Sequence, residues 1–100
     1  MRIIGGQHRG TKLAELAGSK TRPTADHVRE SIFNILAGGR FGDPLSDGIV
    51  IDLFAGTGAM GLEALSRGAT HASFVETDGN ALAVLRANIA KLKREDDSRI

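Results

Sequence analysis

Three glycines form the part of the sequence best suited to hold a ligand. Gly56, Gly58 and Gly61 fit the pattern G-x-G-x-x-G and follow an apolar segment, residues 49–54, that is typical of a parallel strand covered on both faces. The first glycine of such a turn permits a sharp bend, the second lets a ligand approach the backbone, and the third allows a helix to pack closely on a strand. The pattern therefore indicates a nucleotide-like ligand.

Two carboxylates accompany these glycines. Glu76 lies twenty residues after Gly56, at the end of the next predicted strand, where it can accept hydrogen bonds from both hydroxyls of an adenosine ribose. Asp52 lies four residues before Gly56, inside the apolar strand. A carboxylate would repel the pyrophosphate of a dinucleotide, whereas S-adenosylmethionine carries no phosphate and two cationic centres. The carboxylates therefore favour S-adenosylmethionine, and a buried cap is the alternative role for Asp52.

A strand, helix and strand surround the turn. Residues 49–54 form the first strand, residues 59–67 a short helix that Gly68 ends, and residues 72–76 the second strand. The unit spans 28 residues, the length of a βαβ crossover, so the two strands should be parallel neighbours. Asp78 should then cap a further helix, and the charged tail after Lys93 should fray. The apolar positions of that further helix are Leu82, Leu85, Ile89 and Leu92.

The N-terminal part predicts a hairpin followed by a helix. Residues 2–16 contain glycines that suit a hairpin turn. Thr24, just after Pro23, can cap a helix that Gly38 and Gly39 end. Its apolar residues recur at helical spacing and should form the packed face; they are Val28, Ile32, Ile35 and Leu36. With a loop over residues 40–48, the sequence predicts a hairpin and helix extension over 1–40 and a nucleotide-binding half over 41–100.

Charge and composition narrow the functional class. Residues 1–22 hold five cations against Glu15 alone, while residues 41–100 hold six against nine carboxylates. A basic arm on such a body indicates a polyanionic partner, with a solvated surface hairpin as the alternative. Cysteine is absent, so we expect no disulfide and no metal site. Apolar stretches are shorter than the roughly 20 residues of a membrane span, and no signal peptide is recognisable, so we expect a cytoplasmic protein without a membrane partner.

Four stretches of the sequence resemble known families. D-L-F-A-G-T-G-A-M-G-L-E-A-L-S-R-G-A (residues 52–69) and F-V-E-T-D (residues 74–78) look like motifs I and II of class I methyltransferases. R-I-I-G-G-Q-H-R-G (residues 2–10) and R-P-T-A-D-H-V-R-E-S-I-F-N-I-L (residues 22–36) resemble the opening of the RsmD family, bacterial enzymes that methylate a guanine N2 in small-subunit (16S) ribosomal RNA. The resemblance implies an α/β fold, a partial Rossmann-like class I methyltransferase fold with an N-terminal β-hairpin and helix extension. It also implies S-adenosyl-L-methionine as cofactor and small-subunit ribosomal RNA as partner.

The resemblance implies roles for particular residues. The expected cofactor-binding residues are Asp52, Phe54, Gly56, Gly58, Glu76 and Thr24. Cations suited to phosphate oxygens on the arm and first helix are the expected RNA contacts; they are Arg9, Lys12, Arg22 and Arg29. A surface ion pair for Arg29, a capping role for Thr24 and a place in the core for Phe54 are the alternatives.

The sequence departs from the family in one respect. The family places an Asn/Asp-Pro-Pro-aromatic tetrapeptide where it would hold the target amine and stack the flipped base, but the only prolines here are Pro23 and Pro44. We therefore assign no catalytic residue and expect that motif beyond Ile100. We expect these residues to be the N-terminal half of a larger enzyme, to bind cofactor weakly, to transfer no methyl group and to associate through unpaired sheet edges. A nicotinamide-dependent oxidoreductase fragment and a non-enzymatic RNA-binding module are the competing functions.

Overall fold

The computed structural model describes residues 1–16, 23–37, 42–53 and 55–100, with the backbone alone for residues 23–26 and 37. Its elements, in chain order, are α1 (Pro23–Ala37), β1 (Ile49–Asp52), α2 (Ala59–Ser66), β2 (His71–Phe74), α3 (Gly79–Lys91), the 3-10 helix η1 (Glu95–Asp97) and β3 (Ser98–Arg99). The strands lie in the order β1-β2-β3, and both pairs are parallel. The predicted α/β class and parallel pairing are confirmed.

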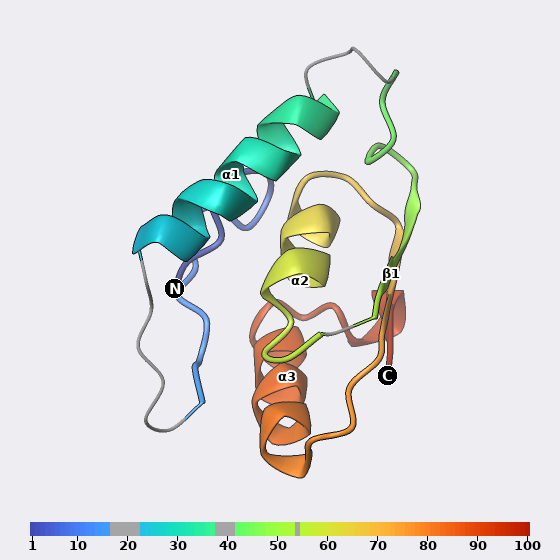
Figure 1. The fold of residues 1–100 in the computed structure, drawn as a ribbon. Helices are drawn as coiled ribbons and strands as arrows, with labels where there is room; N and C mark the ends of the chain where they lie inside the picture. Colours follow the sequence, from blue (N-terminus) through green and yellow to red (C-terminus); the bar gives the residue numbers. More distant parts are fainter. Residues whose placement is uncertain (17–22, 38–41, 54) are drawn as a thin grey trace.

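The sheet carries its two crossover helices on one side. In Figure 1, α2 and α3 both lie on the same side of β1, which is what two successive right-handed crossovers in one direction produce. Asp52 lies opposite Phe74 in the register of β1 and β2. Since β2 ends at Phe74, Glu76 lies two residues beyond the strand that was predicted to contain it.

Two expectations about the strands are wrong. β1 is not covered on both faces: Ile49 is 74% exposed, and Ile51 and the following Leu53 are also exposed. The tail after Lys93 does not fray. It forms η1 and then β3, which pairs with β2, and Arg94 Nε donates to Asp97 Oδ2 at 2.7 Å to hold this turn.

The N-terminal arm, residues 1–16, doubles back as predicted but forms a single bridge. Arg2 and Lys12 are the antiparallel bridge partners, and the Ile3 amide donates to the Thr11 carbonyl at 3.0 Å. Gly6 and Gly10 have positive φ, the conformation that a tight turn requires of glycine. Ile3 and Leu13 are buried in the same hydrophobic cluster as Leu62, Leu65 and Leu85 of α2 and α3, so the arm packs on the sheet domain.

Helix α1 packs through a face that overlaps the predicted one only at Leu36, which is half-buried against the hydrophobic cluster. Val28 and Ile35 are 53% and 58% exposed, and Ile32 is exposed as well. Arg29 and Phe33, four residues apart, are buried instead, because the guanidinium of Arg67, just after α2, lies over the Phe33 ring at 5.1 Å and Glu63 of α2 pairs with Arg29. The helix begins at Pro23, so Thr24 lies in its first turn, after the proline that often occupies the first helical position.

Candidate cofactor-binding site

The glycine turn, residues 56–61, links the end of β1 to the start of α2. Gly56 and Gly58 have φ of +54° and +91°, in the left-handed region that glycine enters without a Cβ clash. The turn is anchored to the neighbouring strand because the Ala55 amide donates to the Val75 carbonyl at 3.1 Å. The Gly58 amide donates to the Ala55 carbonyl at 2.8 Å, which closes the bend.

The three glycines have different surroundings. A Cβ on Gly61 would lie 2.4 Å from Phe74 Cε1 of β2, so this glycine permits the close contact between helix and strand that the pattern predicts. A Cβ on Gly58 would lie 2.5 Å from Leu85 Cδ1, so α3 also depends on a glycine here. A Cβ on Gly56 would meet no atom of the described residues within 4 Å, so Gly56 faces space among them that a ligand can enter.

Glu76 lies against the first glycine. Its Oε1 accepts from the Gly56 amide at 2.8 Å, and its Oε2 accepts from the Thr77 and Asp78 amides, each at 3.0 Å. Hydrogen bonds from the backbone of Asp78 and Gly56 hold the pKa of the Glu76 carboxyl below its usual value, so it is ionised at neutral pH. A carboxylate has about four acceptor positions, and these three bonds leave capacity for a ligand hydroxyl.

Asp52 lies in a neighbouring groove of about 400 Å³ between α1, β1 and α2. Apolar side chains make up most of the wall, among them Ile32, Phe33, Leu53 and Met60. Asp52 is half-buried, and its Oδ2 atom is fully buried. A carboxylate in such surroundings attracts cations more strongly than one in water, because the local dielectric is low.

The structure describes only some of the other predicted site residues. Phe54 and Arg22 lie outside the described residues, as does the side chain of Thr24. Arg9 and Lys12 are exposed on the arm. Arg29 is 4% exposed, its Nη2 donates to the Arg2 carbonyl at 2.5 Å and its Nε lies 3.4 Å from Glu63 Oε1. Because protein encloses its guanidinium, we remove Arg29 from the expected RNA contacts. Arg29 does form an ion pair, as the alternative role proposed, but this pair is buried and not on the surface.

Two polar residues that position the site were not predicted from the sequence. Glu63 is fully buried in α2, where it accepts from the Ile4 and Gly5 amides at 2.9 Å each and from Arg67 Nε at 2.8 Å. Asn88 is fully buried in α3, and its Nδ2 donates to the Thr57 carbonyl of the turn at 2.9 Å. Each is a polar residue on an otherwise apolar helix face, and this pattern could have indicated a buried polar role.

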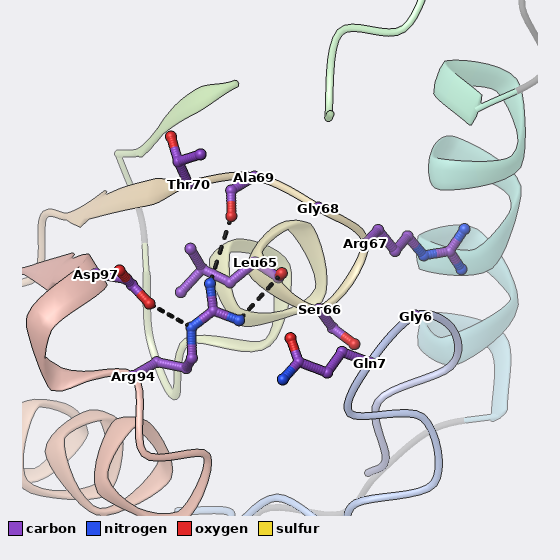
Figure 2. Close-up of a pocket in the computed structure, with 10 residues that line it drawn as sticks. All are labelled: Gly6, Gln7, Leu65, Ser66, Arg67, Gly68, Ala69, Thr70, Arg94 and Asp97. Atoms are coloured by element: carbon purple, nitrogen blue, oxygen red, sulfur yellow. Dashed lines mark hydrogen bonds and ion pairs between the residues drawn. The ribbon is translucent and has the colours of Figure 1, made fainter. Parts of the chain in front are cut away.

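A second hollow, of about 520 Å³, lies at the opposite ends of the strands (Figure 2). Arg94 crosses it, and its guanidinium donates to the Leu65 carbonyl at 3.3 Å and the Ala69 carbonyl at 3.4 Å. Burial and the charge of Arg94 lower the pKa of the adjacent His8, which disfavours a positive charge on its imidazole. These groups bond one another, and we assign this hollow a structural role.

No helix within the described residues is long and apolar enough to cross a membrane. The same part of the chain contains no group of three or more His, Cys, Asp or Glu residues placed to hold a metal ion.

Comparison with known proteins identifies similar sequences and structures. The family described as conserved hypothetical protein 95 matches residues 1–100. "Ribosomal RNA small subunit methyltransferase D" of Escherichia coli K12 is 47% identical over 93% of this chain and 44% of its own length, and the protein of the same name from Haemophilus influenzae is 41% identical over 93% and 46%. The chain thus spans less than half the length of these curated relatives.

Two solved structures share the fold. The Escherichia coli protein yhhF superposes with a TM-score of 0.81 at 44% identity, covering 99% of this chain and 49% of that one. A hypothetical protein of Thermus thermophilus superposes with a TM-score of 0.78 at 35% identity, covering 99% of this chain and 53% of that one.

Proposed function

This chain belongs to the family described as conserved hypothetical protein 95, and from that premise we propose that it supplies the cofactor-binding part of an S-adenosyl-L-methionine-dependent methyltransferase acting on a guanine N2 of small-subunit ribosomal RNA. The observation that carries the proposal is the contact between Glu76 and Gly56. The Gly56 amide holds an ionised carboxylate, which has acceptor capacity left, beside open space.

Each part of the site fits one part of the cofactor. Glu76 would accept from the ribose hydroxyls, Gly56 would lie against the bound adenosine, and Asp52 would face the cationic methionine end. When bound, the cofactor supplies an activated methyl group on a sulfonium. The residues of this chain hold and orient it, and the fixed geometry lowers the entropy cost of transfer. Since the proposed substrate is ribosomal RNA, we propose that the protein acts in the cytoplasm. We also propose that the unpaired edges of β1 and β3 are a surface through which the protein associates with another chain.

Isothermal titration calorimetry with S-adenosylhomocysteine and with NAD tests the cofactor. We expect binding heat with S-adenosylhomocysteine, none with NAD, and a clear loss of affinity in Glu76→Gln. The exposed Glu95 of η1 provides the control, because Glu95→Gln removes the same charge away from the turn. Preference for NAD would favour an oxidoreductase. RNA affinity without any cofactor binding would favour a non-enzymatic RNA-binding module.

A further inference from the structure

Two cations of the N-terminal arm lie beside a cation of α3 that is distant in the sequence. Arg2 and Lys12 are the bridge partners of the arm, and Lys91 belongs to the last turn of α3. Lys91 Nζ donates to the Lys12 carbonyl at 2.5 Å, so its ammonium lies directly against the arm. All three residues are exposed. The basic arm predicted from the sequence therefore continues onto a helix of the sheet domain.

These charges are gathered without being neutralised. Like charges directly opposite one another on paired strands are unfavourable, and Arg2 lies opposite Lys12. Over residues 1–16, 23–37, 42–53 and 55–100, the ion pairs involve the N-terminus, Arg29, Arg67 and Arg94 as cations, and none of Arg2, Lys12 and Lys91. Repulsion among these cations lowers the stability of the protein when no partner is bound. A polyanion that neutralises their charge on binding would relieve the repulsion.

Buried hydrogen bonds hold the three cations in place. Asn88, one helical turn before Lys91, accepts from the Ala14 amide at 2.7 Å and donates to the Ala14 carbonyl at 3.1 Å. These two bonds fix the second half of the arm on α3. A surface that is already ordered loses less conformational entropy when it binds, so these cations are better placed for a partner than those of a free tail.

We propose that Lys91 joins Arg2 and Lys12 in one phosphate-binding surface, across which the RNA backbone runs from the arm to the C-terminal end of α3. The inference rests on the proposed function, because it takes the RNA substrate as the partner. These cations would recognise the charge and position of the RNA phosphates and not the identity of the bases, since contacts to phosphates carry no sequence information by themselves. Lys91 also lies where a cation stabilises a helix C-terminus, so the test must separate the two roles.

The salt dependence of RNA affinity separates them. We would measure binding of a fluorescein-labelled RNA hairpin by anisotropy between about 50 and 200 mM salt. Loss of one phosphate contact lowers the slope of log K against log salt by about 0.7 to 0.9, and we expect this for Lys91→Gln and again for Lys12→Gln, whose backbone carbonyl still accepts the Lys91 bond. Lys91→Arg keeps the charge and should keep the slope. Arg86→Gln is the matched control, because Arg86 is exposed on the same helix but lies beside Glu95, Ser98 and Ile100.

Each outcome decides between the hypotheses. An unchanged slope in Lys91→Gln, or an equal fall in Arg86→Gln, would overturn the proposed surface; the second result would show that only net charge matters. If Lys91→Gln unfolds at lower temperature, the slope of Lys12→Gln decides instead, because that variant keeps the hydrogen bond. Calorimetry with S-adenosylhomocysteine reports on the proposed function separately. Cofactor binding with unchanged slopes would refute the surface alone, whereas changed slopes without cofactor binding would refute the methyltransferase and support the surface.

Discussion

Replacing Glu63 with Gln tests what holds the arm to the sheet domain. The Glu63 carboxylate is fully buried and accepts from the Ile4 and Gly5 amides and from Arg67, with Arg29 at 3.4 Å. A Gln side chain keeps one acceptor oxygen and places an NH2 group where the second oxygen was. With the NH2 group in place of Oε2, the Gly5 and Arg67 donors lose their acceptor; with it in place of Oε1, the Ile4 amide loses its acceptor.

The cost follows from these contacts. Hydrogen bonds to a charged group contribute about 1.5–3 kcal/mol each, and breaking a buried ion pair from one side costs about 3–5 kcal/mol. We therefore expect Glu63→Gln to lower the free energy of unfolding by about 3–5 kcal/mol, against a total of roughly 5–15 kcal/mol for a domain. At about 4–8 °C per kcal/mol for a domain of this size, the melting temperature should fall by at least about 12 °C.

Urea unfolding followed by circular dichroism measures the loss. Glu30→Gln is the control, because Glu30 is exposed on α1 and its replacement should change stability by less than about 0.5 kcal/mol. Amide exchange gives a local measurement. It should accelerate at Ile4 and Gly5 more than at Ala81, whose amide is held by Asp78 at 2.9 Å. A loss below about 1 kcal/mol for Glu63→Gln would refute the reasoning and assign the attachment to the buried Ile3 and Leu13.

Two further predictions concern the turn. Gly61→Ala places a Cβ 2.4 Å from the Phe74 ring and should destabilise the fold by about 1–3 kcal/mol, whereas Gly79→Ala, which meets open space, should raise stability by about 0.4–1 kcal/mol; equal melting temperatures would contradict this. The pKa of Glu76 is lowered by the Asp78 and Gly56 amides, so its contribution is complete above the usual glutamate pKa and is lost as the pH falls through the folded pKa. The melting temperatures of wild type and Glu76→Gln should differ at neutral pH and converge in acid; a constant difference would contradict the assignment.

The sequence predicts those features of the fold that local patterns determine. Asp78 caps α3 as expected, with its Oδ2 accepting from Ala81, and Gly61 meets the strand as the glycine pattern requires. Three of the four residues predicted for the packed face of α1 are exposed, because apolar spacing does not show that Arg29, paired with Glu63, is buried. β3 was missed because its two residues, Ser98 and Arg99, pair only through contact with β2. Both errors depend on partners distant in the sequence, which no local periodicity reports.

Helix α3 contains no part of the glycine motif and none of the RNA contacts expected from the sequence, yet both the glycine turn and the arm depend on it. Its Leu85 fills the space that Gly58 leaves, and its Asn88 bonds both Thr57 of the turn and Ala14 of the arm. Leaving a buried polar group without its partner costs about 1–3 kcal/mol, so Asn88 resists displacement of the turn and the arm alike. The position of the glycine turn and the position of the cationic surface are therefore set by one helix, through a side chain that no motif identifies.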